Sequence, residues 1–191
     1  MLKVMIVDSD LARTKPLRQS LLDNGYDVIA HLTDTSNLDD ACSKLQPDVV
    51  IIDTDSPSRD TLEQICVMTM NDPRPVMMFT HDGDKEQIKL ATQAGVCAYV
   101  VGNLPNERLQ PVIDAAVARF EEFKQLRTAL NEANAKLTER KVIERAKGLI
   151  MKQRNIDENE AYNMLRKMAM QKHMRIGALS AQIVEAAELL L

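Results

Sequence analysis

The sequence predicts an α/β domain with a five-stranded, parallel, doubly wound sheet, followed by a long coiled-coil helix and a small all-α unit of three helices. Three observations support this. In the N-terminal half, short apolar runs typical of strands buried on both faces alternate with helical patterns. A long stretch then carries apolar residues at every third or fourth position. The C-terminal part contains amphipathic helical patterns and an excess of basic residues.

The predicted sheet has five strands, and each is followed by a helix. Gly25 and Gly95 stand where two of these helices end, a position that favours glycine. Because parallel strands need crossover connections, the strict alternation indicates a doubly wound arrangement. We expect strands at residues 2–7, 27–32, 49–53, 76–80 and 98–101. We expect helices at residues 11–24, 38–45, 62–70 and 85–94, and another from about residue 105.

Acidic and hydroxyl side chains stand at the ends of three predicted strands. In open parallel sheets, ligands collect at the carboxyl ends of the strands. Carboxylates gathered there favour a hard divalent cation and a phosphoryl group. These strand-end residues are Asp8, Asp10, Asp53, Asp55 and Thr80.

The N-terminal half, residues 1–120, resembles the receiver domain of response regulators, which has a flavodoxin-like fold. Asp53 stands where receivers carry the phosphoacceptor, and Pro57 follows four residues later. The resemblance implies that the Asp53 carboxylate attacks a phosphoryl donor while a divalent cation offsets the developing charge. It implies Asp53 as phosphoacceptor, Thr80 and Tyr99 as switch residues, and Asp8, Asp10 and Asp53 as ligands of Mg²⁺, with no other cofactor.

Two departures from the receiver pattern weaken the predicted phosphotransfer chemistry. Receivers carry adjacent acids after the first strand, whereas here Ser9 follows Asp8. Receivers also carry a lysine after the fifth strand, where this chain has Gly102. Without that lysine a phosphoaspartate loses a charge-assisted contact of about 1.5–3 kcal/mol. The strand-end acids are therefore either a working site or helix caps and turn residues that remain after activity was lost.

Residues 111–138 predict a coiled-coil linker helix. Charged residues flank its apolar positions, as in a helix that pairs with a second copy. We expect a homodimer, and the alternative is a single helix that folds back on its own receiver. The apolar positions, with one irregular step, are Ile113, Ala116, Phe120, Phe123, Leu126, Leu130, Ala133 and Leu137.

The C-terminal unit, residues 138–191, is the basic part of the chain. It carries 10 Lys and Arg against 7 Asp and Glu, a charge of +3, whereas residues 1–137 carry 14 against 21, a charge of −7. Two short amphipathic helices are expected within residues 140–170, the second starting near Glu158 behind a capping box of Asp157 and Glu160. A third, apolar helix is expected at residues 178–191.

The segments IERAKGLIM and EAYNMLRKMAM, followed by an apolar helix, resemble the ANTAR domain, an RNA-binding antiterminator module. The resemblance implies that a pair of hairpins in a nascent leader mRNA is bound, which prevents the terminator from forming. Small residues such as Gly148 and Ala169 would permit close backbone approach, and Tyr162 is either a core residue or a base-stacking residue. The candidate RNA-binding residues are Lys141, Arg145, Lys147, Gly148, Arg166 and Lys167.

Both resemblances together predict a transcription antitermination regulator of the AmiR/NasT type, and nitrate or nitrite assimilation is the pathway they suggest. Its expected partners are leader mRNA, a second copy of itself, and either a ligand-sensing regulatory protein or a histidine kinase. The alternative is a DNA-binding two-component response regulator phosphorylated at Asp53. Against it, the last helix contains Gln182 but no Arg or Asn. We do not expect an enzyme.

Composition favours a soluble, cytoplasmic protein. Hydrophobic residues make up 45% and charged residues 27% of the 191 positions, which suits globular domains rather than disorder. Three cysteines without metal-ligand spacing argue against a disulfide framework or a zinc site. No apolar run is long enough to span a bilayer, so no membrane association is expected.

Overall fold

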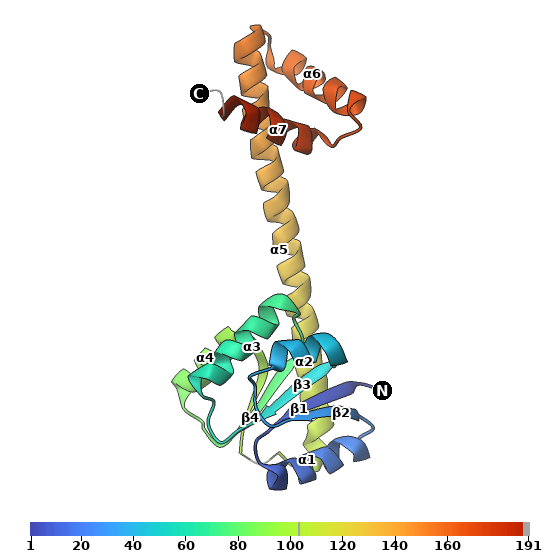
Figure 1. The fold of residues 1–191 in the computed structure, drawn as a ribbon, viewed down its shortest axis with the longest axis vertical. Helices are drawn as coiled ribbons and strands as arrows, with labels where there is room; N and C mark the ends of the chain where they lie inside the picture. The colour runs from blue at the N-terminus through green and yellow to red at the C-terminus, as the bar shows by residue number, and fades with distance from the viewer. Residues whose placement is uncertain (103, 189–191) are drawn as a thin grey trace. The chain divides into compact units, whose positions relative to one another are not determined.

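The computed structural model describes residues 1–102 and 104–188 and divides the chain into two compact units, Met1–Lys124 and Gln125–Leu191. We describe each unit by itself (Figure 1). The boundary falls within helix α5, which therefore contributes to both. The strands are β1 (Lys3–Val7), β2 (Asp27–Leu32), β3 (Val49–Asp53), β4 (Val76–Thr80) and β5 (Val96–Val101). The helices are α1 (Leu11–Asp23), α2 (Leu38–Leu45), α3 (Arg59–Asn71), α4 (Lys85–Ala94), α5 (Asn106–Arg154), α6 (Glu158–Gln171) and α7 (Ile176–Glu188).

The first unit is a parallel five-stranded sheet with the strand order β2-β1-β3-β4-β5. The side chains of the central strands β3 and β4 are almost entirely buried, as their continuous apolar sequences VVIID and VMMFT predict. Helices cover both faces of the sheet (Figure 1). The doubly wound fold expected from the alternating pattern is therefore confirmed.

Alternate residues of the strands build two separate cores. On one face, Met5, Ile52 and Met78 pack against α2, α3 and α4. On the other face, Ile6 and Ile51 pack with α1 and with the first part of α5. Each strand residue points opposite to its neighbour, so a single apolar run supplies both cores.

The first residues of the predicted coiled-coil seam pack within the first unit in helix α5. Ile113, Ala116 and Phe120 are buried, and the first two belong to the core under the sheet. From Phe123 onward the apolar residues are exposed, as Leu126 is at 64%. The irregular step in the spacing of the apolar residues lies at Phe123, where they change from buried to exposed. Residues 111–120 of the predicted seam were therefore assigned wrongly, because packing on the sheet and helix pairing both produce apolar residues at spacings of three and four.

The second unit is a three-helix core made by the end of α5, α6 and α7. Ala146 and Ile150 of α5 pack with Leu165 of α6 and with Leu179 and Val184 of α7. Within each helix, these apolar residues recur every three to five positions and so lie on one face. The core is small and depends on all three helices.

The first of the two short C-terminal helices does not exist as a separate element. It is the continuation of α5, which runs unbroken to Arg154. Gly148 lies inside this helix and does not interrupt it. The turn comes at Asn155, whose φ of 53° is the left-handed conformation that asparagine tolerates. The third helix starts at Ile176, two residues before the expected start, and residues 189–191 of the prediction lie outside the described residues.

The capping box before α6 is confirmed. The Asp157 side chain accepts a hydrogen bond from the Glu160 N–H at 2.8 Å, and the Glu160 side chain accepts one from the Asp157 N–H at 3.4 Å. These bonds satisfy backbone donors that have no partner within the helix. Local sequence therefore sets where α6 begins.

Candidate functional site

The acidic cluster lies at the carboxyl ends of the central strands of the first unit. Val7 of β1 pairs with Ile52 of β3, so Asp8 and Asp53, the next residues along the chain, come out side by side. The Asp8 side chain is fully buried and that of Asp53 is 13% exposed, whereas the Asp55 side chain, two residues further, is 82% exposed. The sheet register alone brings the first two carboxylates together.

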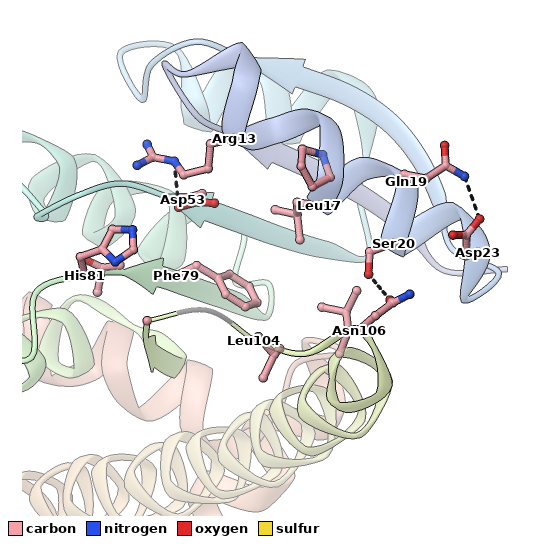
Figure 2. Close-up of a pocket in the computed structure, with 14 residues that line it drawn as sticks. Arg13, Leu17, Gln19, Ser20, Asp23, Asp53, Phe79, His81, Leu104 and Asn106 are labelled. Atoms are coloured by element: carbon pink, nitrogen blue, oxygen red, sulfur yellow. Dashed lines mark hydrogen bonds and ion pairs between the residues drawn. The ribbon is translucent and has the colours of Figure 1, made fainter.

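Arg13 of α1 is the cation of this cluster. Its Nη2 lies 2.9 Å from Asp8 Oδ1, its Nε lies 3.3 Å from Asp53 Oδ1, and its Nη1 lies 2.5 Å from Asp55 Oδ1. Figure 2 shows the arginine reaching from α1 to Asp53 at the end of β3. One guanidinium thus contacts three carboxylates, one that follows β1, one at the end of β3 and one in the loop after β3, using its fork of N–H donors.

Sequence reasoning missed Arg13, although a signal was present. The residue lies in the first turn of α1, where the positive end of the helix dipole disfavours a cation. A basic residue there, three positions after Asp10 and five after a buried strand-end acid, indicates a carboxylate partner close by. Neither distance along the chain nor the receiver pattern revealed that it would reach Asp53 and Asp55.

The surroundings move the pKa values of the two inner carboxylates in opposite directions. Burial by itself raises the pKa of Asp8, but hydrogen bonds from Arg13, the Asp10 N–H and Thr14 outweigh it and hold that pKa below its ordinary value. Burial raises the pKa of Asp53 to about 6, only partly offset by the charge of Arg13. The neighbouring negative charge of Asp8 adds to the increase. Asp53 therefore takes up a proton at a higher pH than an ordinary aspartate does.

Asp10 does not join the other two predicted metal ligands. Its side chain accepts a hydrogen bond from the Ala12 N–H at 2.8 Å and caps α1, and the residue is exposed. Within residues 1–102 and 104–188, no group of three His, Cys, Asp or Glu side chains is arranged to hold a metal ion. Asp8, Asp10 and Asp53 are therefore not brought together as a ligand set. Asp8 and Asp53 do lie close together, but the guanidinium of Arg13 contacts both of them. The residues present do not fit a receiver Mg²⁺ site.

Thr80 and Tyr99, the predicted switch residues, tie together the loops beside the cluster. The buried Thr80 hydroxyl donates to the Asp55 carbonyl at 2.8 Å and accepts from the Asp82 N–H at 3.1 Å. The Tyr99 hydroxyl donates to the Asp82 carbonyl at 2.9 Å. Both side chains therefore hold the loop after β4, and their action as switches stays a prediction.

A cavity of about 540 Å³ lies beside the cluster, between α1 and the segment that follows β5. Leu17 and Phe79 form part of its apolar wall, and Asp53 and His81 part of its polar wall (Figure 2). Gly102, which occupies the position of the receiver lysine, lines it as well. A Cβ atom added at Gly102 would meet nothing within 4 Å. The missing lysine therefore leaves open space in the cavity that Asp53 also lines.

The second unit presents exposed cations on α5 and α6. On α5, Lys141, Arg145 and Gly148 are exposed, and a Cβ atom at Gly148 would meet open space. Arg145 forms an ion pair of 2.7 Å with Glu188 of α7, so its charge is partly compensated. On α6, Arg166 and Lys167 are exposed. These five predicted residues are accessible in the structure.

Lys147 differs from the other predicted RNA-binding residues because it is buried. Only 6% of it is exposed, and its ammonium forms ion pairs with Glu144 at 2.8 Å and with Glu158 at 2.6 Å. The hydrogen bonds that the ammonium donates to these glutamates raise the pKa of Lys147. The exposure expected for Lys147 is therefore wrong. The side chain joins α5 to the start of α6 and has no free charge to offer.

Two neighbouring interpretations also change. Ala169 is 4% exposed and belongs to the core, so it does not permit close approach of RNA. Tyr162 is 43% exposed, so it is not the core residue that its helical spacing favoured. The exposed ring lies four residues before Arg166 and thus on the same side of α6.

No helix among the described residues combines the length and apolar character that crossing a membrane requires.

Comparisons with known proteins assign both units. Residues 4–114 match the response regulator receiver domain family, and residues 124–184 match the ANTAR domain family. The chain is 25% identical over 183 residues to the transcriptional regulatory protein PdtaR of Mycobacterium tuberculosis, covering 96% of this chain and 89% of that protein.

Solved structures similar to this chain include receiver domains of signalling proteins. The signal receiver domain of a modulated diguanylate cyclase from Desulfovibrio desulfuricans aligns with a TM-score of 0.57 at 20% identity and covers 63% of this chain and 97% of that one. The chemotaxis protein CheY4 of Vibrio cholerae aligns with a TM-score of 0.54 at 23% identity and covers 61% and 98%. At these identities the likeness shows the fold alone.

Proposed function

Because the chain belongs to the response regulator family and carries an ANTAR domain after its receiver domain, we propose that it is an RNA-binding regulator of transcription antitermination. The single observation that carries this proposal is the ANTAR match over residues 124–184. The similarity to PdtaR over nearly the whole chain supports a regulator of transcription. In this proposal, residues 1–120 form the receiver, 111–138 the linker and 138–191 the RNA-binding domain.

The proposed RNA contacts are the exposed cations of α5 and α6. Lys141, Arg145, Arg166 and Lys167 can reach phosphates, and Gly148 offers bare backbone for close approach. We add Tyr162, whose exposed ring can stack on an unpaired loop base. Lys147 is left out of this set, because both of its glutamate partners hold its charge.

Control by a ligand-sensing protein that sequesters this regulator is favoured over phosphorylation by a histidine kinase. The Arg13 guanidinium already contacts the Asp53 carboxylate, and Gly102 supplies no cation for a phosphoryl group. The resemblance to regulators of the AmiR/NasT type supports nitrate or nitrite assimilation as the pathway that this protein controls.

The proposal is tested by binding RNA with two hairpins of randomised loop sequence to the full chain at several salt concentrations. We expect affinity to fall as salt rises, because bound cations displace counterions from phosphates. Replacing Lys141 and Arg166 by Gln lowers the slope of log affinity against log salt by about two, since each phosphate contact contributes about one. Lys147→Met leaves the slope unchanged.

The matched control is Lys89→Gln, which removes an exposed cation of α4 in the receiver and should not affect binding. Failure of the wild-type protein to enrich any loop sequence at low salt contradicts the proposal. Equal affinity for duplex DNA and for the selected hairpins at the same salt favours the DNA-binding response regulator instead.

A further inference from the structure

The three carboxylates at the end of the sheet share one cation, and that cation is part of the protein. Asp8, Asp53 and Asp55 bring three negative charges into a small volume, and burial leaves little water to screen those of Asp8 and Asp53. Carboxylates this close repel one another unless a cation lies between them. The Arg13 guanidinium lies there, with a different nitrogen within 3.3 Å of each carboxylate.

We propose that Arg13 is a built-in replacement for the divalent cation of a receiver, so this acidic cluster holds together without a metal ion and excludes one. The inference goes beyond RNA binding and does not depend on it.

The geometry of Arg13 supports replacement rather than coexistence. A divalent cation bound by Asp8 and Asp53 would compete with Arg13, which already contacts Oδ1 of each residue. Nε of Arg13 also donates to Asp8 Oδ2 at 3.3 Å, so both oxygens of that carboxylate are engaged. Thr14 donates to the same oxygen at 3.0 Å. A metal ion can enter only if the guanidinium leaves.

The sequence departures around the cluster agree with this replacement. Ser9 stands where receivers carry a second acid, which removes one hard ligand of the cation. Asp10, the nearest substitute, uses its carboxylate to cap α1. The chain thus lacks a metal ligand and supplies a fixed positive charge at the same point.

The arginine also ties three segments together. It comes from α1 and contacts the residue after β1, the last residue of β3 and the loop that follows β3. The Asp55 carbonyl of that loop accepts the hydrogen bond of Thr80. The loops that respond to a bound cation and phosphoryl group in a receiver are therefore connected here by side chains of the protein itself.

The test measures Mn²⁺ binding to the full chain by the electron paramagnetic resonance signal of the free ion. We expect Mn²⁺ binding to the wild-type protein to be too weak to reach saturation. Arg13→Gln, which keeps a polar side chain but removes the charge, should bind Mn²⁺ at least about tenfold more tightly, a change of ~1.4 kcal/mol. The gain should disappear in the double variant Arg13→Gln with Asp53→Asn. Arg18→Gln, which removes an exposed arginine of the same helix, is the matched control and should behave as wild type.

Two outcomes overturn the proposal. One is saturable Mn²⁺ binding by the wild-type protein that Asp53→Asn abolishes. The other is a folded Arg13→Gln protein, with the wild-type circular dichroism spectrum, that gains no binding. If Arg13→Gln does not fold, Arg13→Lys takes its place. The single ammonium of lysine cannot span three carboxylates, so this variant should also gain Mn²⁺ binding. A folded Arg13→Lys protein without that gain contradicts the proposal. Loss of RNA binding in any of these variants has no bearing on this test.

Discussion

Single residues of this protein show how environment decides the role of a charge. Asp8 and Asp53 end neighbouring strands and share Arg13, yet the pKa of Asp8 lies below its ordinary value and that of Asp53 is raised to about 6. The difference arises because Asp8 accepts several hydrogen bonds, whereas for Asp53 the cost of burial exceeds the attraction of Arg13. Lys147 is a similar case, since two glutamates turn a predicted ligand-binding charge into a structural one.

The raised pKa of Asp53 predicts a dependence of stability on pH. The folded protein keeps the proton on the Asp53 carboxyl up to about pH 6, whereas the unfolded chain releases it near pH 3.8. The contribution of this group to folding stability is therefore complete below pH 3.8 and is lost as the pH rises through 6. The difference corresponds to about 3 kcal/mol at most. Asp53→Asn, which carries no charge, should therefore be more stable than wild type at pH 7.5, and the advantage should shrink as the pH falls toward 4.

Urea unfolding at several pH values, followed by tyrosine fluorescence, measures this effect, because Tyr26 and Tyr99 lie in the first unit. A stability difference between Asp53→Asn and wild type that stays constant with pH, or that grows as the pH falls, contradicts the pKa assigned to Asp53.

At the scale of elements, helix boundaries follow local chemistry, whereas helix partners do not. The capping box of Asp157 and Glu160 starts α6, and Gly95, with φ of 108°, ends α4. Thr69 lies within 2.7 Å of where a Cβ of Gly95 would be, so no larger residue fits. In α5, by contrast, apolar residues at the same spacing pack on the sheet at Ile113 and Ala116, are exposed from Phe123 to Leu137, and pack in the three-helix core at Ala146 and Ile150.

Removing the cap of α6 should destabilise the second unit. Asp157→Ala leaves the Glu160 N–H without its partner, and the loss of such a cap costs about 1 kcal/mol. Unfolding followed by circular dichroism at 222 nm measures the change. Asn159→Ala, an exposed substitution in the same turn, is the control. Equal destabilisation by both variants would mean that the cap contributes nothing specific.

At the scale of the whole molecule, α5 joins an acidic receiver to a basic ANTAR domain and carries an exposed apolar stripe. Phe123, Leu126, Leu130 and Leu137 are between 58% and 64% exposed, and together with Ala133 they follow a regular heptad spacing. Exposed apolar side chains at this spacing are typical of a helix that pairs with another. We propose that a second copy of the chain covers them, in keeping with the two hairpins of the proposed RNA target.

Replacing Leu126 and Leu130 by Ser should separate the proposed dimer. Each leucine lost from a packed seam costs at least about 2 kcal/mol, which weakens association at least about thirtyfold. Sedimentation equilibrium should then show the monomer mass of 21.5 kDa at concentrations where the wild type is dimeric. Leu45→Ser with Leu90→Ser removes two exposed leucines outside the stripe and should leave the dimer intact. A monomeric wild-type protein, or a dimer that survives both serines, contradicts the proposed seam.

The sequence by itself determined the two units, the five strands, the helix that Asp157 caps and the acids at the strand ends, because periodicity and capping are local properties of the chain. Only the tertiary structure decided which partner each charge meets. Arg13 reaches Asp53 and Asp55, forty and forty-two positions away, and Lys147 is buried against Glu158. Such ion pairs depend on how strands and helices are brought together in space, so no local pattern predicts them. In the acidic cluster, they decide whether the carboxylates are arranged around a metal ion or around the Arg13 guanidinium.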